Sequence, residues 1–137
     1  MTTTPIAFTG IDHVQIAVPE GGERACRDFY VGLLGLAEVE RPFEAADRSF
    51  LWVRLGDQQI HFRCDAEFRP ARLAHPGVLV DGLEALADRL AAAGHETTRA
   101  DAVGPGRFHL RDPFGNRIEF LEAGSAAGAG RESQVHE

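Results

Sequence analysis

Four side chains that could bind a metal ion recur at matching places in the two halves of the sequence. His13 and His61 lie in the first half, and His75 and Glu119 lie in the second. Imidazole nitrogens and carboxylate oxygens are ligands that divalent transition metals prefer in proteins. Glu119 lies inside the apolar segment 117–122 and needs a partner, because an unpaired buried charge is costly. The four residues therefore predict a site for Zn, Ni, Co, Mn or Fe.

Each of these residues also has a purely structural interpretation. A single histidine on a strand is more often held by a hydrogen bond than by a metal. Glu119 alone would most often form an ion pair with an arginine such as Arg107 or Arg117, and His61 is the weakest of the four candidates. The repetition favours the metal site, since self-similarity at one period indicates two copies of a structural unit.

The four candidates also share one face of the strands expected to carry them. Side chains of a strand alternate between its two faces. His13 alternates with Val14 in the strand expected at 12–19, and Glu119 lies between Ile118 and Phe120. His61 and His75 are placed in the same way. We therefore expect a helix to cover the apolar face and the opposite face to hold the ligands.

The same alternation brings aromatic and cationic side chains to the ligand face. A mostly apolar surface with a few convergent polar groups is typical of a small-molecule site. We expect the following residues to contact a small-molecule substrate: Phe50, Trp52, Arg54, Arg107 and His109.

The elements that must position these residues form two similar series. Strands are expected at 12–19, 36–43, 48–55 and 59–63, and again at 75–82, 95–100, 107–112 and 117–122. Helices are expected at 21–35, with Ala25, Phe29 and Leu33 on one face, and at 83–94. This order predicts an α+β protein of two tandem βαβββ modules, at about 10–63 and 74–122.

Both modules are expected to belong to one domain, residues 1–122. The remaining segment, 123–137, is small and polar and is predicted to be a disordered tail.

Composition narrows the class of partner. The chain has 137 residues and a formal net charge of −7, which argues against nucleic acid and anionic membrane surfaces. No apolar run reaches the roughly 20 residues of a membrane helix, and the N-terminus lacks the pattern of a signal peptide. Cys26 and Cys64 form no metal or disulfide motif, so two reduced thiols in a cytoplasmic protein are expected.

Four segments resemble the vicinal oxygen chelate superfamily, which includes glyoxalase I, bleomycin-resistance proteins, fosfomycin-resistance enzymes and extradiol dioxygenases. They are "DHVQIAVP", "FYVGLLGL", "HPGVLVDGLEALADRLAAAGHE" and "LRDPFGNRIEFLE", and the resemblance covers about residues 10 to 122. It implies paired βαβββ modules whose curled mixed sheet surrounds a central pocket, with a divalent metal held there by His13, His61, His75 and Glu119. It also implies a site closed either within one chain or between two, and we expect a homodimer, because a half-covered sheet exposes an edge.

The resemblance to glyoxalase I implies a lyase or isomerase that binds two neighbouring substrate oxygens at the metal, with Glu119 as the base. Glyoxalase I usually has a second glutamate at the place of His61, so its proton transfer does not carry over directly. Fosfomycin enzymes use two histidines and one glutamate, which match His13, His75 and Glu119. A dioxygenase is less well matched because the sole tyrosine, Tyr30, lies in the first helix. The resemblance is also compatible with a thiol transferase of the same superfamily and with a metal-free drug-binding resistance protein.

Overall fold

In the computed structural model, residues 3–42, 48–99 and 106–124 are described. Module one contains β1 (His13–Pro19), α1 (Glu23–Arg27), the π-helical segment η1 (Asp28–Leu33), β2 (Ala37–Val39), β3 (Leu51–Leu55) and β4 (Gln58–Asp65). Module two contains β5 (Gly77–Val80), α2 (Leu83–Ala92), β6 (Thr98–Arg99), β7 (Arg107–Arg111) and β8 (Arg117–Glu122). Beyond Gly124, the segment predicted to be a disordered tail lies outside the described residues.

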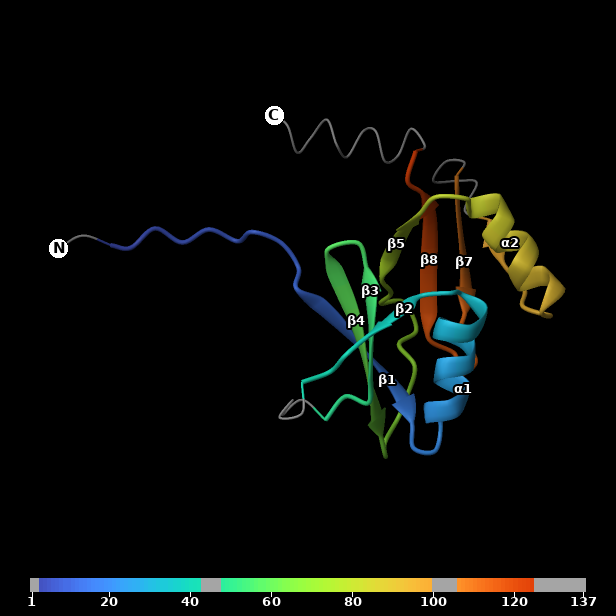
Figure 1. Ribbon diagram of the computed structural model, residues 1–137, viewed down its shortest axis with the longest axis horizontal. Coiled ribbons are helices and arrows are strands. Elements are labelled where there is room, and N and C mark those ends of the chain that lie inside the picture. Colours follow the sequence, from blue (N-terminus) through green and yellow to red (C-terminus); the bar gives the residue numbers. More distant parts are fainter. Residues whose placement is uncertain (1–2, 43–47, 100–105, 125–137) are drawn as a thin grey trace.

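The strands form two four-stranded mixed sheets of the same topology (Figure 1). Sheet one has the order β1-β4-β3-β2 and sheet two the order β5-β8-β7-β6. In each sheet the first and last strands of the module pair in parallel, and the other pairs are antiparallel. The α+β class and the tandem βαβββ modules are therefore confirmed. Among the described residues the two sheets are not hydrogen-bonded to each other, so they do not close into one curled sheet.

The alternation predicted for the strands is present in the burial of their side chains. On β1, Ile16 and Val18 are buried while His13 is exposed, and on β8 Ile118 and Phe120 are buried while Glu119 is half-buried. The buried faces of both sheets join one hydrophobic core. Burying such faces is the main favourable contribution to folding, at roughly 25 cal/mol for each Å² of apolar surface removed from water.

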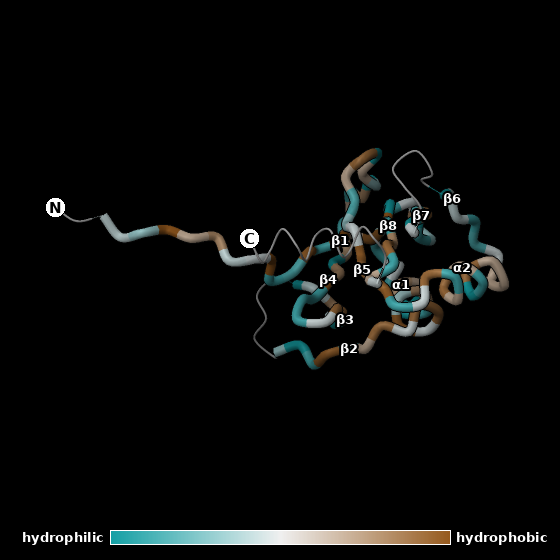
Figure 2. The backbone as a smooth tube through the Cα atoms, turned by 90° about the horizontal axis from the view of Figure 1, so that it is seen from above, coloured by the Kyte–Doolittle hydropathy of each residue, from teal (hydrophilic) through white to brown (hydrophobic). Residues whose placement is uncertain are grey.

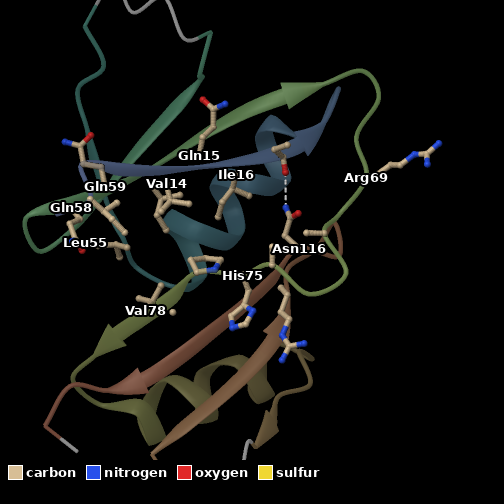
Figure 3. A pocket seen from close by; sticks show the side chains of 18 residues that line it. Val14, Gln15, Ile16, Leu55, Gln58, Gln59, Arg69, His75, Val78 and Asn116 are labelled. Atoms are coloured by element: carbon tan, nitrogen blue, oxygen red, sulfur yellow. Dashed lines mark hydrogen bonds between the residues drawn. The ribbon is translucent and has the colours of Figure 1, made fainter. Parts of the chain in front are cut away.

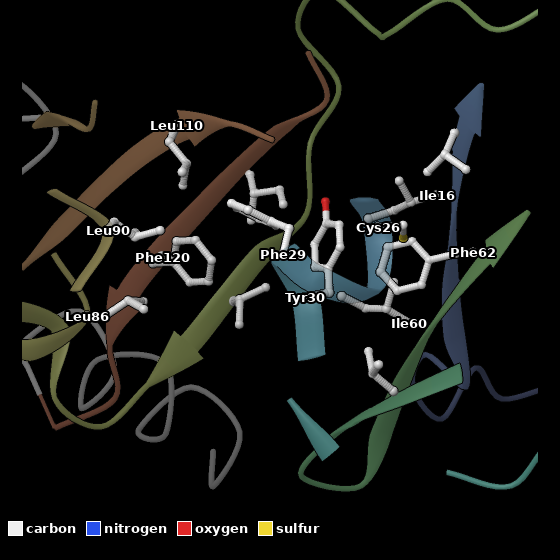
Figure 4. Packing of buried hydrophobic residues seen from close by; sticks show 14 of the residues in the cluster. Ile16, Cys26, Phe29, Tyr30, Ile60, Phe62, Leu86, Leu90, Leu110 and Phe120 are labelled. Carbon is white, nitrogen blue, oxygen red and sulfur yellow. The ribbon is translucent and has the colours of Figure 1, made fainter. Parts of the chain in front are cut away.

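The first helical segment packs between the two sheets (Figure 4). Phe29 and Tyr30 of η1 lie between Phe62 of sheet one and Phe120 of sheet two. The predicted face of this helix was partly wrong, because Ala25 is exposed and the buried residues are Cys26, Phe29 and Tyr30.

The π-helical geometry accounts for part of this difference. A hydrogen bond from Leu34 N to Phe29 O spans five residues rather than four, so the turn is wider than an α-helical one. Leu33, expected on the same face as Phe29, is only partly buried. A prediction that assumes 3.6 residues per turn cannot include such a turn.

The loop at residues 112–116 ties module two to module one. The Asp112 carboxylate is buried, and it accepts hydrogen bonds from Tyr30 Oη at 2.7 Å and from Phe114 N at 2.9 Å. It also accepts hydrogen bonds from Asn116 N and Nδ2 at 2.8 and 3.0 Å. Asn116 Nδ2 further donates to Ala17 O of β1 at 2.9 Å. The segment where the strands expected at 107–112 and 117–122 meet is therefore a buried polar link between the modules.

An N-terminal arm, residues 3–12, leads away from the body of the protein (Figures 1 and 2). It carries three exposed large hydrophobic residues, of which Phe8 is 98% exposed; the other two are Ile6 and Ile11. Leu73 and Leu79, around the start of module two, are also exposed. All five are at least 47% exposed in the described part of this chain.

Candidate functional site

Three rings stack on the open face of sheet one. The centroids of His13 and His61 are 4.0 Å apart, and those of His61 and Trp52 are 3.9 Å apart with nearly parallel planes. Neighbouring strands create the stack, because β1 and β3 flank β4 and Trp52 is the direct cross-strand partner of His61. His61 is consequently only 3% exposed.

Hydrogen bonds distinguish the two histidines of this stack. His13 Nδ1 lies 2.9 Å from Asp12 Oδ2, and because a carboxylate oxygen only accepts, the neutral ring carries its proton on Nδ1 and has its lone pair on Nε2. His61 Nε2 lies 2.9 Å from Gln59 Oε1, so a neighbour on the same strand already occupies this ring nitrogen. His13 is thus prepared to donate a lone pair, whereas His61 is held by packing and by its neighbour on the same strand.

The second pair of candidates lies on sheet two. His75 Nε2 is 3.7 Å from Glu119 Oε1, and Arg107 Nη1 is 3.7 Å from Glu119 Oε2. The carboxylate, 19% exposed, therefore has both an imidazole and a guanidinium beside it at distances longer than hydrogen bonds. His75 Nδ1 donates to Leu73 O at 2.7 Å, which leaves Nε2 as the atom that faces Glu119.

The position of His75 differs from the sequence prediction in one respect. β5 begins at Gly77 rather than at residue 75, and Pro76, which has no N–H to donate, precedes it. The segment still follows β8, since Glu119 N donates to Pro76 O at 3.1 Å. His75 therefore lies outside the strand, and the hydrogen bond from its Nδ1 to Leu73 O orients its ring.

The residues predicted to contact substrate are divided between the sheets. Trp52 and Arg54 lie on β3, and Phe50 lies just before it. Arg107 and His109 lie on β7, where His109 is the direct cross-strand partner of Glu119. Burial and then the nearby charge of Arg117 lower the pKa of His109, which favours a neutral imidazole beside the carboxylate.

The four candidate ligands therefore form two pairs in this chain. In residues 3–42, 48–99 and 106–124, no group of three or more His, Cys, Asp or Glu side chains is close enough to hold a metal ion. One half-site consists of His13 and His61, and the other consists of His75 and Glu119. The donor chemistry suits a divalent metal, because His13 and His75 both present Nε2 while Nδ1 is bonded to an acceptor, as metal-binding histidines usually are.

Sequence reasoning did not assign Arg117 to the site. It lies on β8 two residues before Glu119 and therefore on the same face, and it lines a cavity together with His75. The alternation that placed Glu119 would also have placed Arg117. The hydrogen bond between Asp112 and Tyr30 could not be predicted in this way, because the two residues are 82 positions apart in the sequence.

Comparison with known proteins agrees with this architecture. The family model described as Glyoxalase/Bleomycin resistance protein/Dioxygenase superfamily matches residues 10–120. The chain belongs to this superfamily. None of the proteins of curated function that were compared matches it. In the part of the chain that the structure describes, no helix is long and apolar enough to cross a membrane.

Solved structures of this superfamily have the same fold. A glyoxalase family protein from Bacillus anthracis is 39% identical, with a TM-score of 0.78 over 87% of this chain and 98% of that one. A fosfomycin resistance protein from Listeria monocytogenes is 14% identical, with a TM-score of 0.67 over 88% and 98%. A lactoylglutathione lyase from Agrobacterium tumefaciens is 17% identical, with a TM-score of 0.62 over 83% and 93%. At these last two identities the likeness extends to the fold alone.

Proposed function

We propose that this protein is a cytoplasmic, divalent-metal-dependent enzyme of the glyoxalase type, a lyase or isomerase acting on a small oxygenated substrate. The observation that carries the proposal is the shared arrangement of His13 and His75. In each histidine, Nδ1 is hydrogen-bonded to an oxygen and Nε2 is left for a metal. Glu119 lies beside His75. Two imidazoles and one carboxylate are a sufficient ligand set for Zn, Ni, Co, Mn or Fe.

In this proposal the chain's own residues have separate roles. His13, His75 and Glu119 hold the metal, and His61 positions His13 by ring stacking. When bound, the metal would polarise substrate oxygens as a Lewis acid. Glu119 accepts the substrate proton, and the neutral His109 opposite it lies where it can take part in that transfer.

Two chains are proposed to build each site. The half-sites lie on different sheets, and pairing module one of one chain with module two of another would bring all the ligands together. The exposed apolar residues of the arm and of Leu73 and Leu79 are suited to an interface between copies. A closed dimer of this kind would contain two equivalent sites.

Metal analysis tests the ligand set. Protein purified without chelators should hold about one equivalent of a transition metal per chain, and added metal should raise its melting temperature. His13→Ala and Glu119→Gln should each remove most of that metal, while Glu96→Gln, outside both half-sites, should not. Less than about one-tenth of an equivalent in the wild-type protein, without stabilisation by any of the five metals, would refute the proposal.

Mixing two defective variants tests the shared site. A mixed dimer of His13→Ala and Glu119→Gln chains contains one site with both mutations and one with neither. Random exchange should therefore restore about one quarter of the wild-type metal content. Restoration of none, in a mixture shown by mass spectrometry to contain the mixed dimer, would place each site within one chain.

A metal-free small-molecule binding protein is the second candidate function. It is favoured by the separation of the four candidate ligands into two pairs in the described chain. The acidic net charge of −7 would suit a cationic drug. Tight drug binding that is unchanged in His13→Ala and Glu119→Ala would support this function over the enzyme.

A further inference from the structure

A cavity of about 610 Å³ lies between β1 and β4 of module one and the start of module two (Figure 3). Its wall is largely apolar, with Val14, Ile16 and Leu55 on one side and Val78 on the other. This volume is in the range that holds a small organic molecule. The cavity is separate from the ring stack, because neither His13 nor His61 lines it.

The charged groups that line this cavity are all basic. They are Arg69 and Arg117, accompanied by His75, and no carboxylate from the described residues is among them. Arg69 extends away from the centre and belongs to the rim (Figure 3). These basic groups line the cavity although the chain as a whole carries a formal net charge of −7. Its local potential favours an anion.

Arg117 is the cation best placed to bind that anion. Its Nε is buried and has no hydrogen-bond partner among the described residues, and no described carboxylate forms an ion pair with it. Arg107 Nε also lacks a hydrogen-bond partner among the described residues, but Arg107 does not line the cavity and its Nη1 lies 3.7 Å from Glu119 Oε2. Arg111 donates to three main-chain carbonyls, and Arg99 pairs with Glu84. A buried donor without an acceptor costs free energy, and an acceptor atom on a ligand would remove that cost.

The base of the cavity is fixed before any ligand arrives. Asn116, the neighbour of Arg117, donates from Nδ2 to Ala17 O of β1 and to the buried Asp112 carboxylate. Figure 3 shows the first of these hydrogen bonds crossing beside the cavity. The main chain that carries Arg117 is therefore held against module one, which reduces the ordering cost of binding.

We propose that this cavity binds an organic carboxylate with an apolar body, whose carboxylate group pairs with Arg117. A planar guanidinium matches a carboxylate with two parallel hydrogen bonds. The apolar wall formed by residues such as Val14, Ile16 and Val78 receives the hydrocarbon part. The inference defines a substrate class for the proposed enzyme, but it does not depend on a metal, so each can fail without the other.

Calorimetric titration in the presence of EDTA tests the proposal without any contribution from metal. The probes are straight-chain carboxylates from butyrate to octanoate, the primary alcohols of equal length, and inorganic phosphate. Carboxylate affinity should rise about threefold to fourfold with each added methylene group. The alcohols and phosphate should bind at least about tenfold more weakly than octanoate, because each lacks one of the two recognised parts.

Two variants locate the site. Arg117→Gln should weaken octanoate binding by about tenfold or more, while Arg24→Gln, at an exposed position of α1, should leave it unchanged. Equal binding of octanoate and octanol by the wild-type protein would overturn the proposal, whether or not Arg117→Gln folds. An unchanged dissociation constant in a folded Arg117→Gln protein would also overturn it.

Discussion

Replacing Tyr30 by phenylalanine should destabilise the protein through the loss of one hydrogen bond. The Tyr30 hydroxyl makes the shortest of the four hydrogen bonds to the buried Asp112 carboxylate, at 2.7 Å. A hydrogen bond to a charged group typically contributes about 1.5–3 kcal/mol. The ring is 1% exposed and would remain packed, so little else should change. We therefore expect the free energy of unfolding to fall by about 2 kcal/mol.

Urea unfolding followed by tryptophan fluorescence measures this change. A loss of about 2 kcal/mol in a chain of this size corresponds to a melting temperature lower by about 5–10 °C. A double-mutant cycle with Asp112→Asn is the control, because Tyr30→Phe should cost clearly less once the carboxylate charge has been removed. A loss below about 0.5 kcal/mol would show that the hydrogen bond is not a significant tie between the modules.

The ionisation of Tyr30 provides an independent check. Burial and then the charge of Asp112 raise its pKa well above the usual value. The folded state therefore binds this proton more tightly than the unfolded chain. The associated stability is present below about pH 10 and is lost as the pH rises above it. Since Tyr30 is the sole tyrosine, its ultraviolet absorbance should change only together with unfolding. A separate transition in the folded protein would contradict the assignment.

Four further outcomes are expected. Because burial and then Arg117 lower the pKa of His109, Arg117→Gln should raise it in an NMR titration of the ring protons, and an unchanged midpoint would be inconsistent with that cause. The unfolded chain binds this proton more tightly, so the contribution of His109 to stability should decline as the pH falls through about 6.5. Burial raises the pKa of Cys26 to about 12, so a thiol reagent should label native protein only at Cys64, and labelling of folded Cys64→Ser protein would refute this. Leu90 is 0% exposed, and Leu90→Ala should lower the free energy of unfolding by about 2–5 kcal/mol in urea; a loss below about 1 kcal/mol would mean that the core collapses around the gap.

The sequence was sufficient to predict features that depend on local periodicity. Strand alternation has a period of two residues, so the faces of Ile16, His13, Phe120 and Glu119 follow from their positions alone. The repeat likewise predicted two modules of equal topology. The α+β class followed from the order of the elements.

Features that depend on distant parts of the chain could not be predicted in this way. Alternation assigns a residue to a face of its own sheet, but it does not place one sheet against another. The separation of His13 and His61 from His75 and Glu119 therefore required the structure. The same limit applies to the protonated nitrogen of each histidine, which is set by acceptors such as Leu73 O.

The tie between the modules has a consequence for the order of folding. Tyr30 and Asp112 are 82 residues apart in the sequence, and Asn116 and Ala17 are 99 apart. Strand pairs such as β3–β4 and β7–β8 join over short connections and can form before these distant groups meet. The contacts of Asp112 should thus be among the last to form and the first to break. Stopped-flow measurements on Tyr30→Phe should show faster unfolding with little change in the folding rate, whereas slower folding would place the tie in the nucleus.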